Sequence, residues 1–137
     1  MRLGRKADQP LLFETQAVIL WATGDVPKPV IQLVEAGQRV YVSIVSAWEF
    51  LLKNSRHGFG LDYDQFMEVI RALEAELLPL RAQHLDTLRV LTNVRDHNDP
   101  FDRLLISQAL CENFVLVGGD KQFPLYQRVH ALKLLWD

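Results

Sequence analysis

The sequence is poor in cysteine and has no long apolar run. Cys111 is the only cysteine among 137 residues, which excludes an internal disulfide and a cysteine-based zinc site and is typical of a reducing compartment. We expect this thiol to be a small buried hydrophobe, because it lies in an apolar helical pattern. The apolar run 17–22 is too short for a membrane span or a signal peptide. These features predict a cytoplasmic protein that does not associate with membranes.

Charge of one sign and the common nucleotide-binding loops are also lacking. Fifteen basic and seventeen acidic residues leave a net charge of -2, so a polyanion would have to bind through local basic patches or metal ions. There is no GxGxxG, GxxxxGK[ST] or GxSxG motif, and the four histidines do not have the HExxH spacing. These absences exclude the commonest dinucleotide, P-loop, serine-hydrolase and zinc-protease sites.

Short apolar segments alternate with helical patterns along the chain. We expect strands at 10–13, 39–43, 114–119 and 132–136, with an edge strand at 77–80 that contains Pro79. Helices are expected at 15–23, 29–37, 44–54, 62–76, 81–93 and 100–113, and a short helix or turn at 121–128. The alternation predicts an α/β fold, a three-layer α/β/α sandwich with a mostly parallel sheet. The length fits one domain over 1–137, with 1–9 as a short N-terminal extension.

Two acidic residues follow predicted strands. Glu14 comes directly after 10–13, between two apolar segments, and Asp120 follows the apolar strand that ends in Gly118 and Gly119. In parallel sheets, ligands bind outside the carboxyl ends of the strands. The two acids therefore indicate a binding site, although Asp120 alone fits equally well as a turn residue before the next helix.

Two further acids lie on predicted helices. Asp102 begins the apolar stripe of 100–113, where a carboxylate is costly unless it is paired or binds a metal. The alternative is that Asp99 is the N-cap of this helix and Asp102 its N3 residue. Glu49 lies at the edge of the apolar face of 44–54, where pairing with Lys53 at i+4 explains it as well.

If the four acids converge, their mutual repulsion requires a compensating cation. Like charges a few Å apart raise each other's pKa values. Ligand sets made of oxygen alone favour Mg²⁺ or Mn²⁺ over zinc. Such ions activate water and clamp phosphoryl oxygens, so Glu14, Glu49, Asp102 and Asp120 together would suit chemistry at a phosphate.

Several segments resemble a known family. "NDPFDRLLISQAL" (98–110) and "YVSIVSAWEFLLK" (41–53) are similar to segments of PIN-domain ribonucleases, specifically the VapC-type toxins of bacterial toxin–antitoxin pairs. "LLFETQAVILW" (11–21), "FVLVGGD" (114–120) and "LKLLW" (132–136) agree in order and spacing. The resemblance implies a PIN-like fold and a cytoplasmic endoribonuclease that uses Mg²⁺ or Mn²⁺. It also implies a homodimer that an antitoxin protein inhibits, and metal ligands at Glu14, Glu49, Asp102 and Asp120.

The sequence departs from the family pattern at three positions. Glu14 stands where the family has Asp, Gln16 where it has His, and Gly118 where it often has Thr or Ser. All three lie near the expected site, so two hypotheses stay open: an RNA-cleaving toxin, and a PIN-like module that binds an antitoxin or RNA without cleaving. A phosphoacceptor signalling domain ranks below both, because no acid pair, acceptor Asp and positioned Lys are found together.

Other residues receive weaker expectations. Thr15, Lys53, Arg103 and Lys121 are candidates for contact with RNA, with a solvated surface or a structural ion pair as the alternative for the basic ones. Trp21, Trp48 and Trp136 are expected in the core rather than as stacking platforms. The helices 62–76 and 81–92 are expected to form a groove for an antitoxin segment.

Overall fold

The computed structural model describes residues 9–94 and 97–137, and its centre is a parallel sheet. In this part of the chain the strands are β1 (Leu11–Phe13), β2 (Val40–Ser43), β3 (Glu76–Leu78), β4 (Val115–Val117) and β5 (Lys133–Leu135). Their order is β3-β2-β1-β4-β5, and every neighbouring pair is parallel. The predicted fold class is confirmed, edge strand included. The N-terminal extension expected at 1–9 lies, except for Gln9, outside the described residues.

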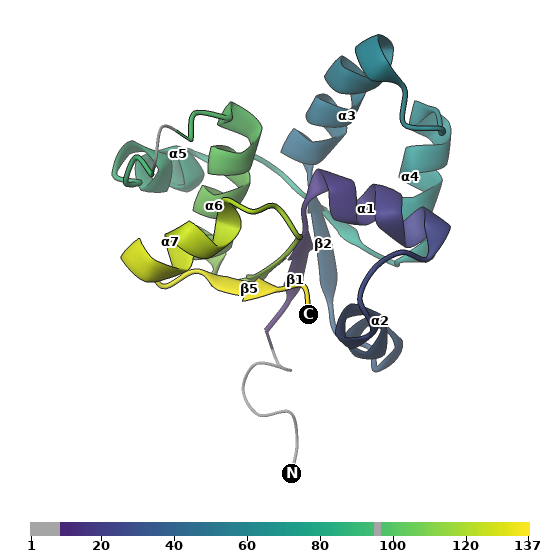
Figure 1. The fold of residues 1–137 in the computed structure, drawn as a ribbon, viewed down its shortest axis with the longest axis horizontal. Coiled ribbons are helices and arrows are strands. Elements are labelled where there is room, and N and C mark those ends of the chain that lie inside the picture. The colour runs from purple at the N-terminus through teal and green to yellow at the C-terminus, as the bar shows by residue number, and fades with distance from the viewer. Residues whose placement is uncertain (1–8, 95–96) are drawn as a thin grey trace.

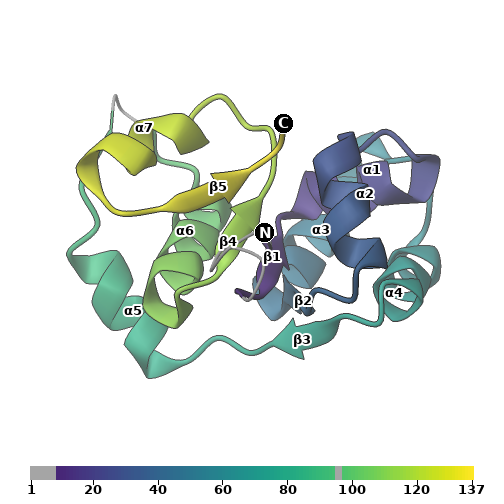
Figure 2. The ribbon, with the colours of Figure 1, turned by 90° about the horizontal axis from the view of Figure 1, so that it is seen from below.

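Helices cover both faces of this sheet (Figures 1 and 2). They are α1 (Thr15–Thr23), α2 (Lys28–Glu35), α3 (Ile44–His57), α4 (Tyr63–Ala72), α5 (Ala82–Arg89), α6 (Pro100–Glu112) and α7 (Phe123–Val129). Helices α1, α2 and α4 lie on one side, and α5, α6 and α7 on the other. None of the described helices has the length and apolar character that crossing a membrane requires.

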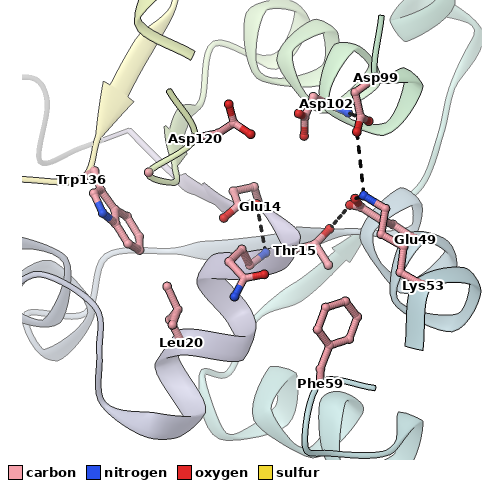
Figure 3. Close-up of a pocket in the computed structure, with 12 residues that line it drawn as sticks. Glu14, Thr15, Leu20, Glu49, Lys53, Phe59, Asp99, Asp102, Asp120 and Trp136 are labelled. Atoms are coloured by element: carbon pink, nitrogen blue, oxygen red, sulfur yellow. Dashed lines mark hydrogen bonds and ion pairs between the residues drawn. The ribbon is translucent and has the colours of Figure 1, made fainter. Parts of the chain in front are cut away.

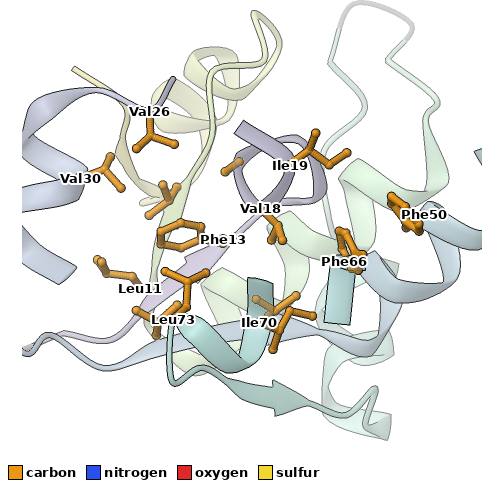
Figure 4. Packing of buried hydrophobic residues seen from close by; sticks show 14 of the residues in the cluster. Leu11, Phe13, Val18, Ile19, Val26, Val30, Phe50, Phe66, Ile70 and Leu73 are labelled. Atoms are coloured by element: carbon orange, nitrogen blue, oxygen red, sulfur yellow. The ribbon is translucent and has the colours of Figure 1, made fainter. Parts of the chain in front are cut away.

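The central strand β1 divides the core into two parts. Successive side chains of a strand point to opposite faces. Leu11 and Phe13 therefore pack into one cluster with Val18, Phe50 and Phe66 (Figure 4). Leu12 packs into the other cluster, with residues such as Leu105, Leu116 and Tyr126. All three β1 residues are fully buried, so Glu14 directly follows a strand at the centre of the core.

Element boundaries differ from the predictions at a few ends. Helix α3 continues to His57, where the predicted helix ended at 54, and gives way at Gly58. Helix α4 ends at Ala72 instead of 76, because Glu74 adopts a left-handed conformation with φ 54° just before β3. Pro79 follows β3 directly, which fits its lack of an amide donor.

Three predictions from the sequence are wrong. Cys111 is exposed, because burial along α6 stops at Ala109, one turn before the helix ends. Trp48 is 55% exposed on the outer face of α3, whereas Trp21 and Trp136 pack partly buried against the core. Helices α4 and α5 lie at opposite ends of the molecule in both views, so they form no common groove.

Candidate metal centre

The four predicted acids line one pocket, although they come from distant parts of the sequence. The pocket has a volume of about 460 Å³ and lies where β1, β2 and β4 end (Figure 3). Its lining comprises Glu14, Thr15, Gln16, Leu20, Glu49, Lys53, Phe59, Asp99, Asp102, Gly119, Asp120 and Trp136. The structure thus brings together Glu14, Glu49, Asp102 and Asp120, and adds Asp99 as a fifth acid.

Glu14 caps the helix that follows it. Its Oε1 accepts a hydrogen bond from the Ala17 amide at 2.8 Å, and its Oε2 accepts one from the Gln16 amide at 2.9 Å. The side chain is 7% exposed. Burial raises the pKa of Glu14 to about 7, against the lowering effect of the two amides and with help from Glu49 and Asp120. Desolvation outweighs the cap, so this carboxylate gains from a nearby cation.

Glu49 is buried in the pocket wall and held at both oxygens. The Thr15 hydroxyl donates to Glu49 Oε1 at 2.5 Å, and Lys53 Nζ lies 2.6 Å from Oε2. The pairing with Lys53 that the sequence offered as an alternative is therefore present. Burial lowers the pKa of Lys53, but its hydrogen bond to Glu49 and the charges of Glu49 and Asp99 raise it overall. The positive charge of Lys53 therefore offsets part of the negative charge of the acids.

Asp102 lies on the buried side of α6, as its place in the apolar stripe indicated. It is 9% exposed. Burial, followed by repulsion from Asp99, Asp120, Glu49 and Glu14, raises the pKa of Asp102 to about 8. Asp99 is the N-cap predicted for α6 and accepts from the amides of Phe101 and Asp102. Both roles in the first turn are thus filled, and the carboxylate of Asp102 remains directed at the pocket.

Asp102 is held by a histidine to which the sequence assigned no role. His97 Nε2 lies 3.2 Å from Asp102 Oδ2, and His97 Nδ1 lies 2.9 Å from the Tyr126 hydroxyl. Arg103 Nη1 lies 3.1 Å from the same hydroxyl. Because Arg can only donate, the Tyr126 oxygen accepts from Arg103. The imidazole of His97 thus connects Asp102 to the Tyr126 hydroxyl through its two ring nitrogens.

The hydrogen bonds that link Arg103, Tyr126, His97 and Asp102, here called the relay, give Arg103 a role other than the expected contact with RNA. The arginine also donates to the carbonyl oxygens of Leu91 and Thr92, and it is absent from the pocket lining. The structure therefore places it behind Asp102 rather than facing the pocket. No local sequence signal points to the relay, because Tyr126 lies 29 residues from His97.

The other candidates divide between two adjoining pockets. Thr15 and Lys53 face the acidic pocket. Lys121 lines a neighbouring pocket of about 390 Å³ that shares Gly119, Asp120 and Trp136 with it. Asp120 is exposed, and its Oδ1 accepts from the Gln122 amide at 2.7 Å. It therefore serves the turn before α7 as well as the pocket.

The donors of the pocket fit a hard divalent cation. All the acids offer oxygen alone, and the pKa values of two of them are raised by burial and repulsion, as expected where a positive charge is needed. The bonds described above hold the carboxylates apart: among the described residues, no three of them place an oxygen each within 4.8 Å of one another. Binding one ion would therefore require rotation of exposed side chains such as Asp120.

A second group of possible ligands lies elsewhere, between α5 and α6. Ligand atoms of His84, Cys111 and Glu112 lie within 4.8 Å of one another. His84 Nδ1 accepts from the Arg81 amide at 2.9 Å, so its Nε2 carries the proton and donates to Glu112 Oε2 at 2.7 Å. A metal at Nε2 would have to displace that proton. This arrangement serves to join the two helices rather than to bind an ion.

Solved structures share this fold at low sequence identity. VapBC2 from Rickettsia felis, bound to a promoter DNA fragment, matches with a TM-score of 0.66 and 17% identity over 93% of this chain and 99% of that one. VapBC-1 from nontypeable Haemophilus influenzae gives 0.65 and 18% over 92% and 96%. DNA-bound VapBC from Salmonella typhimurium gives 0.68 and 13% over 93% and 97%.

The sequence itself identifies the family. No curated protein matches the chain significantly. A family model for the PIN domain matches residues 11–129, a segment that contains all four candidate acids and runs from β1 to the end of α7. The chain therefore belongs to the PIN domain family.

Proposed function

We propose that this chain is a metal-dependent endoribonuclease of the VapC type, the toxin of a toxin–antitoxin pair acting in the cytoplasm. The observation that carries the proposal is the convergence of Glu14, Glu49, Asp102 and Asp120 on one pocket. The sequence pattern and the pocket point to the same four residues. PIN domains are generally nucleases, and the solved neighbours are described as toxin–antitoxin complexes.

The four carboxylates would hold Mg²⁺ or Mn²⁺. When bound, such an ion clamps phosphoryl oxygens and lowers the pKa of water. The chain's own residues prepare the site: Thr15 orients Glu49, and His97 orients Asp102. Lys53 neutralises Glu49 until the ion arrives and would then be free to contact an RNA phosphate. Lys121, beside the adjoining pocket, would meet the strand farther along.

The antitoxin would bind between α1 and α4. A shallow groove of about 390 Å³ lies there, lined by Trp21, Ala22, Gln65, Glu68, Val69 and Ala72. Its mixture of apolar residues, one carboxylate and one amide suits an amphipathic helix with a basic residue at its edge. This groove replaces the one that the sequence placed between α4 and α5.

The homodimer would form through α3. Ile44, Trp48 and Leu51 follow one another at helical spacing and are 43%, 55% and 51% exposed. Such a stripe of large apolar side chains is the kind of surface that a two-fold symmetric interface buries. The stripe lies beside Glu49 on the same helix. A dimer formed through α3 would therefore bring the two acidic pockets close to the shared interface.

Cleavage of total RNA by the purified protein tests the main proposal. We expect discrete cuts with Mg²⁺ or Mn²⁺ that EDTA abolishes and that Asp102→Asn reduces by at least a hundredfold. Asp99→Asn is the matched control, because asparagine keeps the N-cap of α6 and removes one charge from the same pocket. Equal losses in the two variants would show that the charge of the pocket, rather than a ligand, is what matters.

A non-cleaving PIN-like module is the second candidate. It is favoured by the two amide hydrogen bonds that tie Glu14 to its own helix. If the wild-type chain cuts no RNA and Glu14→Asp does, the site is a nuclease attenuated at its first ligand. If neither cuts but both bind the antitoxin, the binding module is the function.

A further inference from the structure

The Glu14 side chain occupies space that a side chain at residue 118 would need. A Cβ built on Gly118 would lie closer than 3.0 Å to Glu14 Cγ and 3.1 Å from Glu14 Cδ. Atoms that are not bonded do not approach so closely in a packed interior. The Cγ and Cδ atoms of Glu14 therefore lie directly against the backbone of Gly118, the residue that follows β4.

Glu14 cannot make room by moving away. Its carboxylate is fixed at both oxygens by the amides of Gln16 and Ala17, and the side chain is buried. The clash would fall on the middle of the side chain, whose two ends are both held. An alanine at this position has neither a Cγ nor a Cδ, so it would remove both atoms that a side chain at 118 would meet on residue 14.

Gly118 is needed for its small size rather than its flexibility. Positive φ values occur at Gly24, Gly37, Gly58 and Gly60, but not at Gly118. Other residue types could adopt the backbone conformation of Gly118, but their Cβ atom would collide with the Glu14 side chain. Gly119 differs in its surroundings, because a Cβ there would meet the indole of Trp136.

We infer that Glu14 and Gly118 are a matched pair, in which the missing side chain at 118 leaves the space that the side chain at 14 occupies. Gly118 is thus a positioning residue for Glu14. The steric part is independent of any ion, and its consequence for metal binding rests on the proposed function.

The single variant Gly118→Ala does not isolate this pair. The same Cβ would lie 2.8 Å from Phe123 Cε2, so part of its cost has nothing to do with Glu14. A double-mutant cycle separates the two parts, because the Phe123 clash is common to both backgrounds and cancels. The informative quantity is the change in the cost of Gly118→Ala when residue 14 is shortened.

The test measures the denaturation midpoint of the metal-free protein in EDTA. Gly118→Ala is made in three backgrounds: wild type, Glu14→Ala and Glu14→Gln. We expect the midpoint to fall in the wild type and in Glu14→Gln, which keeps the length, and to fall by less than half as much in Glu14→Ala, which lacks both contact atoms. Equal falls in all three backgrounds would overturn the pairing and assign the clash to Phe123.

Gly119→Ala is the matched control, because its Cβ meets Trp136 instead of Glu14. Its cost should be the same whichever residue stands at 14. If Gly118→Ala does not fold alone but folds when combined with Glu14→Ala, the pairing is supported. If it folds in neither background, while Gly119→Ala costs the same in each, the clash is independent of Glu14 and the pairing fails.

A calorimetric Mn²⁺ titration of the same variants reads the consequence for the site. Moving a ligand's support changes metal affinity by about 10–100-fold, so we expect Gly118→Ala to lose about tenfold in affinity in the wild type and to change it little in Glu14→Ala, where the ligand itself is absent. If the wild type binds no Mn²⁺, the proposed function is contradicted while the midpoint cycle still decides the pairing. If Gly118→Ala leaves Mn²⁺ affinity unchanged although the midpoints are coupled, the positioning role toward the ion is refuted.

Discussion

His97 Nε2 pairs with Asp102 Oδ2, with the two atoms 3.2 Å apart in a buried part of the structure. The other ring nitrogen of His97 pairs with the Tyr126 hydroxyl, which accepts a hydrogen bond from Arg103. The orientation of a candidate ligand therefore depends on Arg103, which does not reach the pocket. Such outer hydrogen bonds fix ligand geometry in metal sites.

Removal of the tyrosine hydroxyl should weaken metal binding. Tyr126→Phe keeps the buried ring but leaves His97 Nδ1 without its hydrogen-bond partner, so the imidazole and Asp102 lose their fixed orientation. We expect Mn²⁺ affinity to fall about 10–100-fold, and the free energy of unfolding to drop by about 1–3 kcal/mol. Isothermal titration and chemical denaturation measure the two effects.

The control for this variant is Tyr41→Phe, which removes a hydroxyl that bonds Arg39 at the exposed surface. It should leave Mn²⁺ affinity unchanged. An unaltered affinity in Tyr126→Phe would show that Asp102 needs no support from the relay.

Stability of the metal-free protein should decrease as the pH rises. The pKa of Glu14 is raised from 4.5 to about 7 and that of Asp102 from 3.8 to about 8, in both cases mainly by burial. The folded state thus holds more protons than the unfolded chain between about pH 4 and pH 8, and its stability declines across that window. Below the unfolded values the contribution is complete, and above pH 8 the decline levels off.

Thermal melting in EDTA at half-unit pH steps checks this dependence. Saturating Mn²⁺ should flatten it or reverse its sign, because the ion favours the ionised carboxylates and releases their protons. Asp102→Asn should shorten the window at its upper end. A metal-free melting temperature that rises steadily from pH 5 to pH 8 would contradict the raised pKa values.

Loss of the lysine that neutralises Glu49 should tighten metal binding. Lys53→Gln removes a charge 2.6 Å from Glu49 Oε2 that competes with an incoming cation. Because the lysine is 39% exposed, we expect a modest gain in Mn²⁺ affinity, about fivefold, which corresponds to ~1 kcal/mol. Arg56→Gln on the same helix is the control. A weaker affinity in Lys53→Gln would mean that the lysine orders Glu49 more than it repels the ion.

A charge on the apolar stripe of α3 should prevent dimerisation. Trp48→Asp places a carboxylate at the centre of the proposed interface, and we expect the dimer to weaken at least about thirtyfold, equivalent to about 2 kcal/mol for a central aromatic residue. Sedimentation velocity over a concentration series gives the dissociation constant. Val90→Asp alters the most exposed large apolar side chain, 68% exposed and outside the stripe, and should leave the dimer intact. A wild-type chain that sediments as a monomer at every concentration would remove the proposed interface.

The sequence predicted what local patterns can carry. The segment 10–13 ends in an acid, and Asp99 with Pro100 opens α6, so both the sheet and the ends at which the acids lie were foreseeable. The predictions failed where the outcome depends on how deeply a helix face is buried. Helical spacing alone does not reveal that α6 leaves the core before Cys111 or that Trp48 on α3 is more than half exposed. Contacts between distant segments, such as Tyr126 with His97 and Gly118 with Glu14, leave no spacing to recognise.

The sheet order has a consequence for a chain that is still being synthesised. Strand β4 pairs with β1 through residues more than a hundred positions apart, and Asp102 and Asp120 flank that late strand. A ribosome that has produced the first 94 residues has made Glu14 and Glu49 but only one side of the pocket. Whatever chemistry the pocket performs, this unfinished chain cannot perform it. Dividing the protein after residue 94 would likewise give two fragments, neither of which has a complete site.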